Sequence, residues 1–188
     1  KFVQVLPEST SDGSFFRAIH AIHLHQHHLA LHHIQMTRAT MDTELTALIG
    51  ESYSRAYIPA IRVQMLSDLE EIMEYAQCDA GDDGKRERIK RSLTLRLKDC
   101  QETIEVWQRL MKIRNLVIPM DEDKDLWIRF AQMAHESKRT ALSTIILNAL
   151  LHIDGDNQHP QASLSHLHVA SVDPQVAYAY IQPCWAAG

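Results

Sequence analysis

The sequence predicts an all-α protein, an α-solenoid assembled from antiparallel helix pairs. Three observations support this prediction. Apolar residues recur at steps of three and four along most of the chain, which is the period of an amphipathic helix. Capping residues, glycines and prolines divide these stripes into segments of helix length. One pattern of bulky and small side chains also occurs twice, as in stacked helical hairpins.

The bulk composition is that of a folded domain. Of the 188 residues, 45% are hydrophobic and 23% are charged, so the chain can bury a core. The net charge of −5 argues against a broad nucleic-acid-binding surface, which is normally basic. The cysteines at 78, 100 and 184 show no close pairing and fit a reducing compartment. No apolar run reaches transmembrane length, so we expect no direct membrane insertion.

The first helical hairpin is expected near the start of the chain. Residues 1–13 read as an extended lead-in segment, and capping groups at 11–14 precede the apolar residues of a first helix. A turn over residues 25–28 then leads into a second helix over about residues 29–48.

A long amphipathic stretch follows this hairpin. Gly50 is expected to interrupt one helix, and Ser52 or Ser54 to begin the next. Pro59 should redirect the chain, because proline lacks the N–H that a helix interior needs. Turn residues over 78–84 should end this helix.

Residues 85–114 are predicted to form the longest helix, about 45 Å long at about 1.5 Å per residue. Its apolar stripe keeps to steps of three and four. The stripe consists of Ile89, Leu93, Leu97, Cys100, Ile104, Trp107 and Met111.

Two more helices and a loop complete the chain. An acidic first turn at 121–125 opens one helix, a basic corner at 138–139 closes it, and residues 140–151 form the next. Residues 156–172 are polar and rich in histidine, which predicts a loop. Residues 173–174, Asp-Pro, then provide an N-cap and a proline at the first helical position.

The repeated pattern pairs a bulky aromatic residue on one helix with a small alanine on the next. Such pairs let antiparallel helices pack closely, as in tetratricopeptide-like arrays. The first set is Phe16, Ala30, Leu31 and Ile34, and the second is Trp127, Ala141, Leu142 and Ile145.

Several long blocks resemble one known family. They are DGSFFRAI (12–19), DTELTALIGESYSRAY (42–57) with VQMLSDLEEI (63–72), LKDCQETIEVWQRLMKIRNLVI (97–118), LWIRFAQMAHESKRTAL (126–142) and DPQVAYAYIQPCW (173–185). Together they resemble the FAT domain of TOR (target of rapamycin) serine/threonine protein kinases of the PI3K-related family, particularly fungal ones. The chain starts without an initiator methionine and stops after helix-like residues, so we expect residues 1–188 to be part of one FAT domain, truncated at both ends.

The resemblance implies a helical scaffold that wraps around a kinase domain. The parent kinase would use ATP and Mg²⁺, and this segment would carry no cofactor of its own. Implied partners are the parent's kinase domain, neighbouring FAT repeats and TOR complex subunits. The implied location is the cytoplasm, or vacuolar and endosomal membranes through the parent complex. The residues expected to anchor the packing are Phe16, Tyr53, Tyr57, Leu66, Trp107, Trp127 and Phe130.

Catalytic motifs of a kinase are absent from the sequence. There is no Gly-x-Gly loop, no Val-Ala-Ile-Lys strand and no Asp-Phe-Gly. We therefore expect no catalytic residues in this segment. Aspartate runs at 121–125 and 154–156 lack the glycine and closing glutamate of a calcium loop, so we expect no tight calcium site.

Two weak candidates for ligand sites remain. His23/His27 and His28/His32 have the i, i+4 spacing at which two imidazoles can share a metal. No cysteine or acidic third ligand lies nearby in sequence, and polar surface histidines are the favoured interpretation. Some members of the resembled family bind an inositol phosphate. The candidates here are Arg114, Lys138 and Arg139, although Glu136 stands where a family lysine is expected and ordinary solvated charge is favoured.

Two rival functions stay open. A stand-alone helical-repeat adaptor would present a concave peptide-binding surface, and a reading frame that ends at Gly188 would favour it. A histidine-rich metal protein would retain stoichiometric zinc after purification without a tag.

Overall fold

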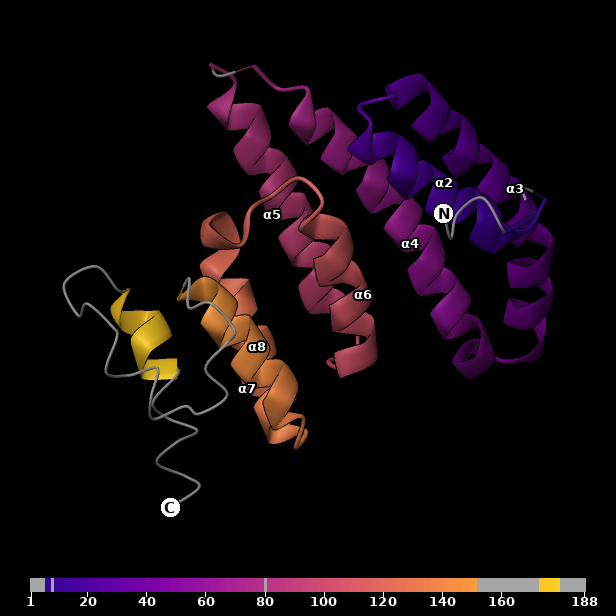
Figure 1. Ribbon diagram of the computed structural model, residues 1–188. Helices are drawn as coiled ribbons and strands as arrows, with labels where there is room; N and C mark the ends of the chain where they lie inside the picture. The colour runs from indigo at the N-terminus through magenta and orange to yellow at the C-terminus, as the bar shows by residue number, and fades with distance from the viewer. Residues whose placement is uncertain (1–5, 8, 80, 152–172, 180–188) are drawn as a thin grey trace. The chain divides into compact units, whose positions relative to one another are not determined.

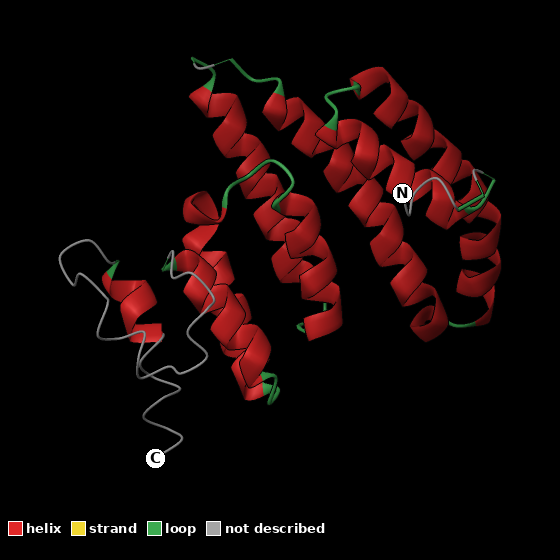
Figure 2. Ribbon diagram, viewed as in Figure 1, coloured by secondary structure: helices red, strands yellow, loops and turns green. Residues whose placement is uncertain are grey.

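The computed structural model describes residues 6–7, 9–79, 81–151 and 173–179, and all of their regular structure is helical (Figure 2). The predicted all-α class is confirmed. A further short helical segment covers residues 174–179. In chain order the main elements are α2 (Ser11–His23), α3 (His27–Glu51), α4 (Tyr53–Ala76), α5 (Asp83–Asp99), α6 (Ile104–Arg114), the 3₁₀ helix η1 (Met120–Asp123), α7 (Lys124–Glu136) and α8 (Thr140–Leu150) (Figure 1).

The helices fall into two compact units. The first comprises Lys1–Cys100 and Leu110–Val117, and the second comprises Gln101–Arg109 and Ile118–Gly188. Helix α6 therefore contributes its first turns to the second unit and its last residues to the first.

In the first unit α2 packs on α3, α3 on α4, and α4 on α5 (Figure 1). Alanines lie where the first two helices face each other: Ala18 and Ala21 on α2 and Ala30 on α3 are all buried. Small side chains allow the two backbones to approach closely, and larger apolar residues such as Ile34 fill the space around them.

Helix α2 begins inside the lead-in segment that the sequence predicted over residues 1–13. Its N-cap is Thr10 instead of a residue at 11–14, because Thr10 Oγ1 accepts the N–H of Gly13 at 3.0 Å. Arg17 also donates to the carbonyl of Leu6 at 2.9 Å, which holds the preceding chain against the helix.

One of the two expected interruptions occurs. Helix α3 continues through Gly50 and ends at Glu51, and Ser52, in an extended conformation, is the N-cap of α4, as predicted. Gly50 lies in the last turn, where the loss of helix propensity counts least. Pro59 lies inside α4, which continues to Ala76, so a single missing hydrogen bond does not end this helix. The predicted end of this helix near the turn residues is confirmed, because α4 ends at Ala76 and α5 starts at Asp83.

The predicted long helix over residues 85–114 is wrong. It is two helices, α5 and α6, and Cys100 between them has extended backbone angles (φ −77°, ψ 158°). The apolar stripe crosses the break without losing its phase, because Leu97 and Ile104 are seven residues apart, close to two helical turns. Its members other than Cys100 are all buried, and Cys100 is partly exposed.

The second unit follows the predicted order closely. The acidic turn at 121–125 forms η1 and the start of α7, and α8 covers the helix expected over 140–151. Asp173 is the predicted N-cap, since its Oδ1 accepts the N–H of Gln175 at 3.0 Å. Asp173 also pairs with Lys124 of α7 at 3.2 Å, which ties the segment 174–179 to this unit. The loop predicted over residues 156–172 lies outside the described residues.

The two units contain equivalent hairpins, but the predicted alignment is wrong by two residues. Of the proposed partners, Ala30 and Ile34 are buried, whereas Ala141 and Ile145 are exposed. When the second hairpin is aligned to the first with an offset of 113 residues, in place of the predicted 111, buried positions pair with buried positions. This offset pairs Ala18 with Ala131, Ala21 with Ala134, Ala30 with Ser143 and Ile34 with Leu147, and all eight residues are buried.

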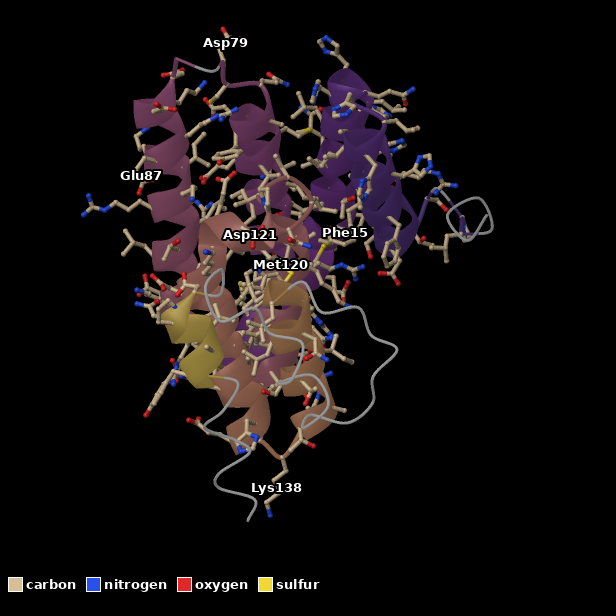
Figure 3. All side chains as sticks on the ribbon, turned by 60° about the vertical axis from the view of Figure 1, so that its left-hand side comes forward. Phe15, Asp79, Glu87, Met120, Asp121 and Lys138 are labelled. Carbon is tan, nitrogen blue, oxygen red and sulfur yellow. The ribbon has the colours of Figure 1, made fainter. Side chains whose placement is uncertain are left out.

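The turn hydrogen bonds fix this new alignment. His25 N–H donates to the Ile22 carbonyl at 2.9 Å, and Lys138 N–H donates to the His135 carbonyl at 2.9 Å. The next amide in each turn reaches the carbonyl five residues back, from Gln26 to Ala21 and from Arg139 to Ala134. Each hairpin is therefore closed by a Schellman motif whose central residue has positive φ, 56° at His25 and 61° at Lys138. Figure 3 shows Lys138 at the tip of the second hairpin.

Replacement of Lys138 by glycine should stabilise the second hairpin. A side chain costs about 1–2 kcal/mol in the left-handed region, and glycine removes this cost while losing some entropy on folding. We expect Lys138→Gly to raise the free energy of unfolding by about 0.5–1 kcal/mol in urea denaturation. Lys138→Ala is the control, because it removes the charge and keeps the strain. An equal effect of the two substitutions would contradict the explanation.

Candidate sites: packing anchors, a buried ionic cluster and basic side chains

The predicted packing anchors divide into two groups. Leu66, Trp107, Trp127 and Phe130 are buried, as expected of side chains that hold helices together. Phe16 is 37% exposed and Tyr53 is 82% exposed, so neither is a core anchor in the described residues, and Tyr57 is half-buried. On α2 the buried aromatic residue is the neighbouring Phe15, because only Phe15 shares a helix face with Ala18 and Ile22 (Figure 3).

Helix α7 carries the aromatic centre of the second unit. Trp127 and Phe130 are one helical turn apart and meet edge to face, with ring centroids 6.2 Å apart. Ala131 and Ala134 lie beside them in the same core. An edge-to-face pair stabilises by about 0.5–1.5 kcal/mol beyond the burial of the two rings, so this pair contributes substantially to the stability of the hairpin.

The first unit contains a partly buried ionic cluster formed by Asp68 and Glu71 of α4 and Arg96 of α5. Arg96 Nη1 donates to Glu71 Oε1 at 2.7 Å. Arg96 Nη2 lies 2.9 Å from Asp68 Oδ1, an ion-pair distance, although the angles are not those of a hydrogen bond. The Asp68 side chain is 8% exposed, against 31% for Arg96. The cluster therefore joins two helices through a carboxylate that has little access to water.

Burial dominates the electrostatics of Asp68. Its pKa rises from 3.8 to about 6, because burial disfavours the carboxylate more strongly than the nearby Arg96 guanidinium favours it. Glu71 adds to the increase through its own charge. Asp68 also lines a cavity of about 10 Å³ with Arg114 and four apolar residues, a space close to that of one water molecule.

The raised pKa of Asp68 predicts a pH-dependent stability. The folded state binds a proton more readily than the unfolded state between about pH 4 and pH 6, so stability from this group increases as the pH falls through 6. Between about pH 7.5 and pH 5, wild type should gain about 1 kcal/mol of unfolding free energy relative to Asp68→Asn. Urea denaturation at both pH values measures the difference. A constant difference, or one that favours the variant at the lower pH, would rule out this assignment.

The three basic residues of the predicted inositol-phosphate site belong to different units. Arg114 lies in the first unit and is 4% exposed, and its Nη2 donates to Thr94 Oγ1 at 2.9 Å and to the Lys90 carbonyl at 3.4 Å. Lys138 and Arg139 lie in the second unit and are exposed. Arg139 forms an ion pair with Glu105. The inositol-phosphate site therefore stays a prediction for these residues.

One of the two histidine pairs spans the turn of the first hairpin, and the other lies within a single helix. His23 ends α2 and His27 begins α3, and the positive φ of His25 between them breaks the helical spacing on which a shared metal would depend. His28 and His32 both lie on α3 and are exposed. In the part of the chain that the structure describes, no three histidine, cysteine or acidic side chains are grouped so that they could hold a metal ion.

None of the helices formed by the described residues is long and apolar enough to cross a membrane.

Sequence reasoning did not identify the ionic cluster. In the sequence Asp68 and Glu71 are two of several polar residues among the apolar ones over 63–76, and Arg96 lies 25 residues or more beyond them. The usable signal was weak: an acidic residue at 68 falls between the apolar positions Leu66 and Leu69. Such an acid on a buried face requires a positive partner.

Comparison with known proteins gives one family. The model of the FAT domain matches residues 1–188. The chain is 36% identical over 188 residues to the serine/threonine-protein kinase TOR2 of Saccharomyces cerevisiae. This match covers 100% of this chain and 7% of the relative. It is 36% identical over 184 residues to the serine/threonine-protein kinase TOR of Oryza sativa subsp. japonica, covering 96% of this chain and 7% of the relative.

An animal relative is equally similar. The serine/threonine-protein kinase mTor of Drosophila melanogaster is 36% identical over 180 residues, covering 96% of this chain and 7% of the relative. Because identity to yeast, plant and fly proteins is the same, the prediction of a fungal source stays untested. The chain spans about one fourteenth of the length of these relatives.

Proposed function

The chain belongs to the FAT domain family, and from this membership we propose that it is a non-catalytic scaffold segment of a TOR-type serine/threonine protein kinase. The segment would clamp and support the kinase domain and help the complex to assemble. The observation that carries the proposal is the repeated hairpin, with the same Schellman turn and the same buried positions 113 residues apart. Repeated hairpins form rods of stacked helices whose stability depends on contacts between neighbours.

The chemistry would be performed elsewhere in the same polypeptide. We propose that the parent transfers a phosphoryl group from ATP, with Mg²⁺, to serine or threonine of other proteins in nutrient and growth signalling. In such transfers the protein contributes mainly position and electrostatics, so a clamp that holds the kinase lobes affects the rate without touching the substrate. The proposed partners are the kinase domain, neighbouring FAT repeats and complex subunits. The proposed location is the cytoplasm, or vacuolar and endosomal membranes through the complex.

A core substitution in the intact kinase tests the scaffold proposal. Leu66 is fully buried in α4, and Leu66→Ala should cost about 2–5 kcal/mol of stability. We expect the variant kinase to phosphorylate a protein substrate more slowly. We also expect less assembled complex to be recovered on purification. Leu95→Ala is the matched control, because Leu95 is 53% exposed on α5.

Two outcomes decide the scaffold proposal. Loss of activity and assembly in Leu66→Ala alone supports it. Unchanged activity and assembly in a variant whose segment is sensitive to proteolysis would contradict it. The stand-alone adaptor is favoured instead by a reading frame that ends at Gly188.

A further inference from the structure

Tyr57, which was expected in the core, lines a surface groove, and Tyr53 is exposed four residues before it on the same helix. Tyr53, Tyr57, Ala60 and Gln64 follow one another at steps of four, three and four, so they share one face of α4. The last three line a cavity of about 250 Å³ together with Ile61, with Arg96 and Asp99 of α5, and with Cys100, which follows α5. We call this cavity with Tyr53 the tyrosine groove. All of its residues belong to the first unit.

The tyrosine groove leaves apolar surface uncovered. Tyr53 is 82% exposed at the start of α4, and Ala60, about two helical turns later on the same face, is also exposed. Close by in sequence, Ile49 at the end of α3 is 44% exposed. Aromatic and aliphatic side chains that follow one helix face at this spacing are suited to a second helix, which presents its own anchors at the same spacing.

The size of the groove favours side chains over a small molecule. Sites for drug-sized ligands have about 300–1,000 Å³, and the tyrosine groove has about 250 Å³. This space suits one or two anchoring side chains of a partner helix.

The charge of the groove selects the chemistry of that helix. Arg96 is held by Asp68 and Glu71, so its positive charge is already matched. Asp99 is exposed and forms no ion pair among the described residues. A lysine or arginine of the partner would pair with Asp99, and a second could lie over the ring of Tyr53 or Tyr57.

We propose that the tyrosine groove docks a basic amphipathic helix of the same polypeptide that lies outside residues 1–188. The inference rests on the proposed function, in which this segment belongs to a far longer chain. The relatives supply the reason for that source, because this chain matches only 7% of their length. Apolar anchors of the helix would fill the cavity over Tyr57, Ala60 and Ile61, and its cations would face Asp99.

Photocrosslinking in the purified intact protein tests the docking. The probe is p-benzoylphenylalanine in place of Tyr53, which keeps an aromatic ring at an exposed position. We expect it to capture a segment of the same polypeptide with apolar residues at steps of three and four and with at least two lysines or arginines. In the Asp99→Lys background the yield should fall about tenfold, which corresponds to about 1.4 kcal/mol.

Two controls test the position and the charge. The same probe at Leu29, which is 45% exposed near the start of α3 and so at the opposite end of that helix from the corner at Tyr53, should not capture that segment. Asp79→Lys, at the exposed corner between α4 and α5, should leave the yield at Tyr53 unchanged (Figure 3). Mixing isotope-labelled and unlabelled protein distinguishes capture within one polypeptide from capture between chains.

Several results would overturn the proposal. The probe could capture no segment, an acidic or non-amphipathic segment, or a segment of another chain. A crosslinking yield that does not change with Asp99→Lys would overturn it as well. Phosphorylation of a protein substrate, measured on the same samples, reports separately on the proposed function. An active kinase without the expected crosslink would remove the docking proposal alone.

Discussion

Truncation of Trp127 to alanine is expected to lower the free energy of unfolding by about 3–5 kcal/mol. Trp127 is 8% exposed and meets Phe130 edge to face, so the substitution leaves a cavity in the second unit and removes the aromatic pair. Urea denaturation followed by far-UV circular dichroism measures the change. A loss of this size is a large part of the stability of a typical domain.

The control for this substitution is Tyr178→Ala. Tyr178 belongs to the same unit and is 68% exposed, so its removal should change stability by less than about 0.5 kcal/mol. Equal midpoints for wild type and Trp127→Ala would show that Trp127 is not an anchor.

Removal of Arg96 should also destabilise the protein strongly. Arg96→Ala leaves the carboxylates of Asp68 and Glu71 without their shared cation, and the cost of breaking a buried pair is about 3–5 kcal/mol. Arg96 is 31% exposed, so water can replace part of its contribution, and we expect a loss of about 2–3 kcal/mol near neutral pH. The loss should shrink near pH 5, because burial raises the pKa of Asp68 to about 6 and the protonated acid needs no cation.

Arg91→Ala is the comparison for this experiment. Arg91 lies on the same helix and is exposed, so its removal should change stability little at either pH. A loss in Arg96→Ala that is independent of pH would mean that Asp68 is not the group that loses its partner.

Local patterns predicted most helices and turns. The cap at Asp173 and the turn between α4 and α5 follow from residue types that favour those conformations. The break between α5 and α6 was missed because its length preserves the phase of the apolar stripe from Leu97 to Ile104. Periodicity alone cannot separate one helix from two that remain in phase.

The features that the sequence did not predict depend on longer-range packing or on unusual turn residues. The Schellman turns use His25 and Lys138, whereas glycine is the usual signal for positive φ, so the alignment of the two hairpins was placed two residues away. Phe15 and Phe16 are neighbours, and only the packing of α2 on α3 decides which ring is buried. The link from Asp68 to Arg96 joins two helices and has no local pattern.

The most direct test of the scaffold claim compares stability and kinase activity in the intact protein across one set of variants. The set is wild type, Trp127→Ala, Tyr178→Ala, and Trp127→Ala combined with Lys138→Gly. We predict that phosphorylation of a protein substrate follows the stability of the segment, so that Lys138→Gly restores part of both. Full activity in Trp127→Ala despite a segment shown to be unfolded by proteolysis, or loss of activity in Tyr178→Ala without loss of stability, would contradict the account.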